Sequence, residues 1–292
     1  MIDLDLVRSW QGSAVAVLRV VVAETRGSTP RETGAFMLVT ETTQTGTIGG
    51  GDLEFQCLEH ARLILRGEAV REDRRFTLGP ESGQCCGGVV LIRYEPVFDL
   101  DEELRRLEQR RLDWPTLSVF GAGHVGRALV RAAALLPLSL RWIDPRPEEF
   151  GPVPEGVMVQ VSTAWESEIA SLRPGDGVLV MTPSHALDAL ITGAALERGD
   201  LAYVGLIGSH TKRRRFESGF REIGLAQSRI DALVCPIGDQ GLRDKRPEII
   251  AALVASELAR RLVPRIDHGR QTSDSNDAQH DAAAALDQGE RR

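Results

Sequence analysis

The chain has 292 residues, of which 42% are hydrophobic and 26% charged, and this length is sufficient for two domains of ordinary size. A net charge of −7 disfavours nucleic acid as a partner, and no apolar run reaches the ~20 residues needed to span a bilayer. The first residues lack the charged-then-apolar pattern of a signal peptide, and four cysteines are too few for a disulfide scaffold. We therefore expect a cytoplasmic protein that binds neither nucleic acid nor membrane.

Residues 1–96 are expected to form an N-terminal domain of the α+β class. A stripe of apolar residues that includes Leu53, Cys57 and Ala61 predicts a helix over 52–66. Strands are predicted at 13–23, 35–40, 71–78 and 89–94. The first of these strands is too continuously apolar to lie at the edge of a sheet.

The remaining chain divides into a connector, a second domain and a tail. Residues 97–115 are charged and amphipathic, which predicts a connector with one short helix over 101–111. From 116 to 266 short apolar strands alternate with helices, and this pattern predicts a Rossmann-like domain with a doubly wound parallel sheet. Residues 267–292 lack apolar periodicity and are expected to be disordered.

A glycine-rich turn follows the first strand of the second domain. Gly121, Gly123 and Gly126 have the G-x-G-x-x-G spacing between an apolar strand and a helix. The first glycine allows a tight turn, the second lets a phosphate approach the backbone, and the third lets the helix pack on the strand. Asp144 follows the next strand, where an acidic residue holds a nucleotide ribose. The pattern is compatible with a bound dinucleotide such as NAD(P).

Two loops of the first domain are candidates for holding an anion. The loop at 26–31 combines hydroxyl and guanidinium groups, which belong to Arg26, Ser28, Thr29 and Arg31. The other places Gly49, Gly50 and Gly51 before a helix with Glu54 in its first turn. Consecutive glycines cost backbone entropy on folding. Their use here therefore indicates that a ligand approaches the backbone closely. The structural alternatives are a polar surface turn and a tight turn.

The stretch at 84–87 is a glycine-flanked cysteine pair with the sequence Gln84, Cys85, Cys86, Gly87. No pair of Cys or His residues at two-to-five-residue spacing has a matching second pair, as a zinc site would need, but thiolate is a soft metal ligand. Cys85 and Cys86 are therefore candidate metal ligands, and the alternative is two reduced thiols in a turn. Cys57 and Cys235 are expected to serve packing.

Polar residues also follow three strands of the predicted parallel sheet. They are His124 in the glycine loop, His185 after Ser184, and His210 after Ser209. Ligands of open α/β sheets bind at the carboxyl ends of the strands, and these positions lie there. A histidine at a helix start is otherwise a cap or a surface residue.

In chain order, the motifs are Gly27-Ser-Thr-Pro-Arg31, Gly46-Thr-Ile-Gly-Gly-Gly51 with Leu53-Glu54, Gly83-Gln-Cys-Cys-Gly-Gly88, Gly121-Ala-Gly-His-Val-Gly126, Asp144-Pro-Arg146, Ser184-His-Ala-Leu-Asp188, Gly205-Leu-Ile-Gly-Ser209 with Thr211-Lys212, and Cys235-Pro-Ile-Gly238. From about Val17 to Leu262 the chain thereby resembles the XdhC/CoxI family, the accessory proteins of xanthine dehydrogenase and related molybdenum hydroxylases. Pro183 departs from the family pattern, which has a histidine there, and leaves His185 without a histidine pair.

The resemblance implies binding of the molybdenum cofactor, a pterin phosphate that carries Mo on a dithiolene. It implies a chaperone without turnover that protects this cofactor during sulfuration with a cysteine desulfurase. The cofactor then goes to xanthine dehydrogenase or a related molybdenum hydroxylase. Glycine-rich loops on both sides of the connector predict a cofactor site between the two domains, and a homodimer is an open expectation. The alternative is an NAD(P)-dependent oxidoreductase that uses the Rossmann-like domain.

Overall fold

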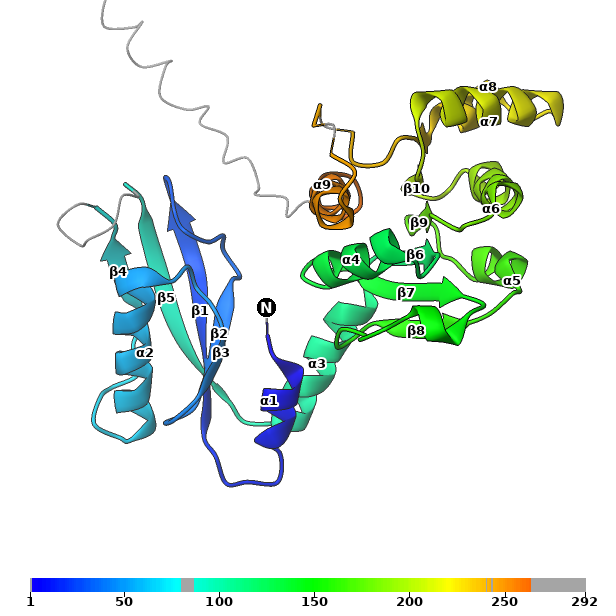
Figure 1. Cartoon of the computed structure of the whole chain (residues 1–292). Helices are drawn as coiled ribbons and strands as arrows, with labels where there is room; N and C mark the ends of the chain where they lie inside the picture. Colours follow the sequence, from blue (N-terminus) through cyan, green and yellow to red (C-terminus); the bar gives the residue numbers. More distant parts are fainter. Residues whose placement is uncertain (1, 80–86, 240, 243, 264–292) are drawn as a thin grey trace, which may run out of the picture.

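The computed structural model describes residues 2–79, 87–239, 241–242 and 244–263, so the predicted Gln84, Cys85 and Cys86 site and the tail at 267–292 lie outside the described residues. Two separate sheets organise the chain (Figure 1). The first is antiparallel with strand order β3-β2-β1-β5-β4, and the second is parallel with order β11-β10-β9-β6-β7-β8. The predicted fold class, an α+β domain followed by a Rossmann-like domain, is confirmed.

The antiparallel sheet of the first domain is built around β1. Its strands are β1 (Val17–Arg26), β2 (Phe36–Val39), β3 (Gln44–Gly46), β4 (Arg74–Thr77) and β5 (Val89–Val97). β1 pairs with β2 on one side and β5 on the other, so it is a central strand, as its continuous apolar sequence predicts. One face is covered by α2 (Gly51–Leu65), whose buried side chains Leu53, Cys57 and Ala61 form the predicted stripe.

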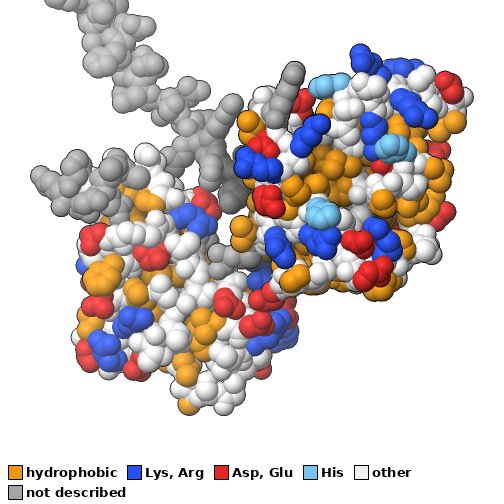
Figure 2. Space-filling view, in the orientation of Figure 1, with side chains coloured by type: hydrophobic (Ala, Val, Ile, Leu, Met, Phe, Trp, Pro, Cys, Tyr) orange, Lys and Arg blue, Asp and Glu red, His pale blue; other side chains and the backbone are white. Residues whose placement is uncertain are grey.

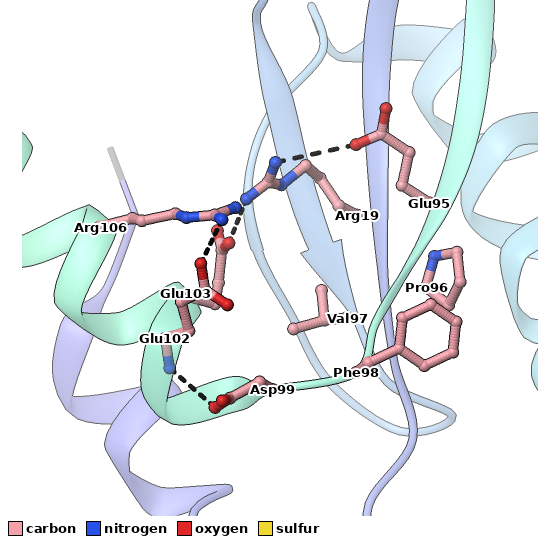
Figure 3. A pocket seen from close by; sticks show the side chains of 9 residues that line it. All are labelled: Arg19, Glu95, Pro96, Val97, Phe98, Asp99, Glu102, Glu103 and Arg106. Carbon is pink, nitrogen blue, oxygen red and sulfur yellow. Dashed lines mark hydrogen bonds and ion pairs between the residues drawn. The ribbon is translucent and has the colours of Figure 1, made fainter.

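The other face of this sheet is covered by α1 (Leu4–Ser9) and α3 (Leu100–Leu112). Leu104 and Leu107 of α3 pack with Leu38 of the sheet in one buried cluster. Arg19 of β1 donates a hydrogen bond to Glu103 of α3, which is only 4% exposed. Figure 3 shows this ion pair on the wall of a small cavity of about 230 Å³. The connector helix therefore packs on the first domain.

The second domain holds the opposite end of α3. Arg173 donates from Nη1 to the carbonyl of Leu112 and from Nη2 to that of Trp114, at 3.0 Å each. Asp176 accepts a hydrogen bond of 2.8 Å from the backbone N–H of Thr116, the first residue of β6. α3 is thus fixed at one end by the first sheet and at the other by the second domain.

The second domain has helices on both faces of its parallel sheet. Its strands are β6 (Thr116–Phe120), β7 (Ser139–Asp144), β8 (Met158–Val161), β9 (Gly177–Val180), β10 (Tyr203–Leu206) and β11 (Leu233–Val234). Its helices are α4 (His124–Ala133), α5 (Trp165–Ala170), α6 (His185–Arg198), α7 (His210–Glu222), α8 (Gln227–Asp231) and α9 (Pro247–Arg261), with a 3₁₀ turn at Pro147–Glu149. α4 and α9 cover one face, and α5 to α8 cover the other. None of the described helices could cross a bilayer.

The order of the parallel strands reverses at β6. The chain runs outward from β6 through β7 to β8, and β9 then returns to the other side of β6. Open α/β sheets bind ligands outside the carboxyl ends of the strands at such a reversal. This places the glycine turn after Phe120, the last residue of β6, at the position where a ligand is expected.

Candidate functional site

Three loops of the first domain meet at one end of the antiparallel sheet. We call residues 26–31, 47–51 and 87–88 the N-terminal loop cluster. A Cβ on Gly49 would lie 2.5 Å from the Cβ of Pro30, and one on Gly88 would lie 2.3 Å from the carbonyl oxygen of Ser28. Only glycine fits at either position. Motifs that are far apart in the sequence are therefore in direct contact.

Glu54 holds the middle loop of this cluster. Its Oε2 accepts hydrogen bonds from the hydroxyl of Thr47, from the N–H of Ile48 at 2.9 Å and from the N–H of Gly50 at 3.1 Å. The N–H of Gly49 donates to the hydroxyl of Thr47 at 3.1 Å. Glu54 therefore anchors the loop, and two of the three glycine N–H groups predicted to face a ligand are engaged within it.

The polar loop at 26–31 divides into inward and outward groups. Arg31 pairs with Glu32 at 3.1 Å, and the hydroxyl of Thr29 donates to the carbonyl of Arg31 at 3.1 Å. Arg26 and Ser28 are exposed, as are Gly51 and Gly87. The outward groups of this cluster are therefore Arg26, Ser28 and the backbone at Gly51 and Gly87. Gly87 directly follows the cysteine pair in the chain.

The second group of loops lies at the carboxyl edge of the parallel sheet. We call residues 121–126, 144–146, 182–188 and 207–212 the sheet-edge cluster. A Cβ on Gly121 would lie 2.4 Å from the carbonyl oxygen of Met181, and one on Gly126 would lie 2.3 Å from that of Gly121. These contacts match the tight turn and the close helix packing predicted for the first and third glycines.

The N-terminus of α4 is open. Gly123 is its N-cap residue and supplies no side chain to the first N–H groups, and His124 is exposed. Uncapped N–H groups at a helix start favour an anion. The glycine turn is thus open to an approaching phosphate, as its spacing predicts.

Asp144 is 2% exposed, and its carboxylate is fully occupied by protein groups. Oδ2 accepts from the N–H of Ala122 at 2.8 Å and from Nη2 of Arg146 at 2.9 Å. Oδ1 accepts from the backbone N–H and from Nε of Arg146, at 3.0 Å each. Burial alone would raise the pKa of Asp144, but these hydrogen bonds outweigh it and the pKa lies below its usual value. A ribose could reach the carboxylate only by displacing Arg146.

A buried ion pair at the same edge was not predicted from the sequence. Asp188 of α6 is fully buried, and its Oδ2 accepts from Nζ of Lys212 of α7 at 2.6 Å. Its Oδ1 accepts from the N–H of Thr182 at 3.0 Å and from the hydroxyl of Thr182 at 2.8 Å. Lys212 also donates to the carbonyl of Ile207 at 3.0 Å. This pair ties together the loops that follow β9 and β10.

The residues selected from the sequence at these two loops lie at the starts of α6 and α7. Ser184 and Ser209 accept hydrogen bonds at the helix starts, from the N–H of Leu187 at 3.3 Å and that of Lys212 at 3.2 Å. His185 is exposed, and His210 is exposed beside Asp239. Asp188 and Lys212 lie one helical turn further on, which was the available signal.

Two cavities adjoin the sheet-edge cluster. One of about 450 Å³ is lined by Asp144, Arg146 and Trp165, among others, and the other, of about 1280 Å³, lies between α6 and α7. Figure 2 shows hydrophobic side chains on this domain with Lys, Arg and His side chains around them. All lining residues of both cavities belong to the second domain, and in Figure 1 the arrow of β7 points away from the first domain. The predicted site between the domains therefore has no counterpart in either cavity.

Across the described ranges, no three or more His, Cys, Asp or Glu side chains are grouped as metal ligands would be. The ionised groups of the sheet-edge cluster are instead paired with one another, as in Asp144 with Arg146 and Asp188 with Lys212. Cys57 and Cys235 are free and buried, as expected for packing residues. The cysteine pair at 85–86, which was the predicted metal site, lies outside the described residues.

The fold and its two clusters define a two-domain α/β protein in which a parallel Rossmann domain follows an antiparallel α+β domain. Residues 10–86 match the model of the XdhC and CoxI family, and residues 117–258 match that of the XdhC Rossmann domain. The chain belongs to the XdhC/CoxI family.

A curated protein and a solved structure are among the proteins similar to this chain. The uncharacterized protein YqeB of Escherichia coli K12 is 29% identical over 247 residues, which cover 81% of this chain and 42% of YqeB. The chain thus spans less than half the length of that relative. The crystal structure of a xanthine dehydrogenase from Bacillus halodurans superposes with a TM-score of 0.73 at 21% identity, covering 89% of this chain and 95% of the other. At this identity the likeness supports the fold alone.

Proposed function

We propose that this protein carries the molybdenum cofactor as cargo, protects it during sulfuration with a cysteine desulfurase, and delivers it to xanthine dehydrogenase or a related molybdenum hydroxylase. Family membership implies an accessory role for a xanthine dehydrogenase. Binding and delivery of the cofactor go beyond that role and are what we propose. The cargo is a pterin phosphate with Mo on a dithiolene, so it presents an anion, a planar ring and a metal with a preference for sulfur.

The observation that carries the proposal is the contact between the three loops of the N-terminal loop cluster. Glycines at 49 and 88 let these loops touch one another, and the cysteine pair directly precedes the last of them. Exposed guanidinium and hydroxyl groups of Arg26 and Ser28 lie at the same cluster. A cationic donor and a hydroxyl suit the phosphate of the cargo, and the two soft thiols that precede Gly87 in the sequence suit its metal.

In this proposal the residues of the chain have distinct tasks. Arg26 and Ser28 bind the phosphate, because Arg31 and Thr29 are engaged within their own loop. Cys85 and Cys86 hold the metal through thiolate, which binds Mo and exchanges with other ligands. Glu54 makes no contact with the cargo and keeps the loop at 47–51 in place. Delivery then requires that the receiving enzyme replace both the thiolate contacts to Mo and the contacts of Arg26 and Ser28 to the phosphate.

The test uses the full chain purified from a host that makes the cofactor. Mo is measured by mass spectrometry and pterin by the fluorescence of its oxidised form, in the wild type and in Cys85→Ser and Cys86→Ser. We expect at least one of these variants to lose most of its Mo and to fail in activating an apo-dehydrogenase. Cys57→Ser is the matched control, because its sulfur is buried beneath α2. Full Mo content in both loop variants would contradict the proposal.

The alternative, an NAD(P)-dependent oxidoreductase, gives a different outcome in the same preparation. An oxidoreductase consumes NAD(P)H in the presence of a substrate, and its rate does not depend on the cysteine pair. Under our proposal the purified chain shows no such turnover, and Mo content follows Cys85 and Cys86. Substrate-dependent oxidation of NAD(P)H that survives both cysteine changes would favour the oxidoreductase.

A further inference from the structure

The cavity of about 450 Å³ beside the glycine turn has the walls of a site for a planar ring. It lies at the carboxyl ends of β6, β7 and β9, where the strand order reverses. Its floor is apolar and includes Ile143 and Ile191, which are 3% and 1% exposed. The half-buried indole of Trp165 forms part of its wall. A nucleobase has the size and the flat apolar faces that such walls accept.

The rim of the cavity is polar and is organised by Arg146. Asp144 holds this guanidinium through Nε at 3.0 Å and Nη2 at 2.9 Å, so its plane is fixed. The remaining nitrogen, Nη1, lies 3.5 Å from Glu149 Oε1, at the limit of a hydrogen bond, and Glu149 in turn lies 3.4 Å from Arg127. The hydroxyls of Ser162 and Thr163 line the same rim.

We propose that this cavity binds a nucleotide that carries a phosphate on its ribose, as in adenosine 2′-phosphate. The base packs on Trp165 and Ile191, and the ribose phosphate accepts hydrogen bonds from Arg146 Nη1 and the rim hydroxyls. Arg146 makes the distinction. A ribose hydroxyl both donates and accepts, but its O–H finds no free acceptor on Asp144, because every acceptor position of that carboxylate is already used. A phosphate accepts, which the fixed guanidinium satisfies.

The open start of α4 lies beside this cavity and receives the 5′-phosphate of the same nucleotide. Gly121 lines the cavity, and the uncapped N–H groups of α4 begin three residues further along the chain. The inference concerns binding and requires no hydride transfer. It is independent of cargo binding at the N-terminal loop cluster, so either can fail without the other.

Calorimetric titration of the full chain tests this inference with two probes, adenosine 2′,5′-bisphosphate and adenosine 5′-monophosphate. We expect the bisphosphate to bind about tenfold more tightly, the effect of one additional charge-assisted contact. In Arg146→Ala the preference should reverse, because the bisphosphate loses its partner while Asp144 becomes free to accept from the ribose diol. Arg131→Ala, an exposed arginine of α4 outside the cavity, is the matched control and should leave both affinities unchanged.

A second variant covers the case in which Arg146→Ala does not fold. Thr163 is exposed on the rim and makes no contact with Asp144 through any described hydrogen bond, so Thr163→Trp should fill the mouth of the cavity and abolish binding of both probes at an unchanged melting temperature. The inference is overturned if the wild type binds neither probe. It is also overturned if both probes bind equally in the wild type, or if Thr163→Trp binds them as the wild type does.

Discussion

The two loop clusters are both built on glycine turns, but they hold their backbone by different means. In the N-terminal loop cluster, loops touch through Gly49 and Gly88, and the single carboxylate of Glu54 accepts from backbone N–H groups. In the sheet-edge cluster two carboxylates, Asp144 and Asp188, are each paired with a cation. The first cluster is held by shape and the second by charge.

This difference separates what each cluster can offer to a ligand. Glu54 accepts from the N–H groups of Ile48 and Gly50, so these two backbone groups are not available to a phosphate. At the sheet edge the carboxylates are buried under their own cations, and the start of α4 keeps its N–H groups. Glycine motifs that look similar in the sequence therefore differ in their backbone N–H groups, which donate to Glu54 in the first cluster and stay uncapped at the start of α4 in the second.

The largest effect is expected at the buried ion pair of the sheet-edge cluster. Asp188→Ala leaves Lys212, which is 15% exposed, without its partner, and removal of one member of a buried pair costs about 3 to 5 kcal/mol. The free energy of unfolding in urea measures this loss. Asp231→Ala, on the exposed surface of α8, is the control and should change it by less than about 0.5 kcal/mol. A loss below about 1 kcal/mol for Asp188→Ala would show that charge does not hold this cluster.

A smaller effect should appear where shape holds the loops. Gly49→Ala places a methyl group 2.5 Å from Pro30 at a φ of +131°, so strain and overpacking together should cost about 3 kcal/mol. Gly50→Ala is the matched control, because nothing lies within 4 Å of its Cβ position and only the backbone strain of its φ of +73° and ψ of −169°, about 1 to 3 kcal/mol, remains. Equal losses in the two variants would mean that contact with Pro30 does not limit the loop.

The pH dependence of stability distinguishes Asp144 from a surface carboxylate. Its folded-state pKa lies below 3.8, the ordinary value, so its contribution to stability is complete above about pH 4 and declines as the pH falls through the folded-state pKa. Asp144→Asn lacks this contribution. The gap in unfolding free energy between wild type and variant should be constant near neutral pH and narrow in acid. If the difference in unfolding free energy does not change with pH, the ion pair of Asp144 with Arg146 does not stabilise the fold.

The smallest effect concerns the buried thiols, which belong to neither cluster. Burial raises the pKa of Cys57 and of Cys235 to about 11, and their side chains are 0% and 2% exposed. Neither thiol should react with iodoacetamide at pH 8 in the folded protein, because the reactive thiolate is scarce and inaccessible. Peptide mass spectrometry measures the modification, and urea-unfolded protein is the positive control. Rapid labelling of Cys57 in the folded chain would contradict the packing of α2.

Most of the fold could be predicted because its strands and helices have strong local patterns. The apolar run at 13–23 predicted a buried strand, and the apolar stripe over 52–66 predicted α2. Among the elements that were missed, two in the first domain share a physical reason. β3 has the sequence Gln-Thr-Gly with no apolar alternation, and α1 is only six residues long. Both are stabilised by the sheet on which they lie rather than by their own sequence.

The candidate site could be predicted only as far as its motifs. The glycines were identified because their spacing is local, but their contacts with Pro30 and Ser28 depend on loops that the fold brings together. The ion pair of Asp188 with Lys212 joins residues 24 positions apart, so no local pattern pairs the two, although each lies one helical turn after a residue selected from the sequence. The sequence likewise suggests that Asp144 accepts from a ribose, whereas in the structure its carboxylate accepts from Arg146, two positions further on.

The attachment of α3 at both ends has a practical consequence for dividing this protein into pieces. A fragment that stops at residue 96 would uncover Leu38, which Leu104 and Leu107 bury, and apolar surface of this kind promotes aggregation. A fragment that starts at residue 116 would remove the carbonyl acceptors that Arg173 binds. Workable halves must therefore overlap, and both need α3: the first should end no earlier than Leu112, and the second should begin no later than Leu100.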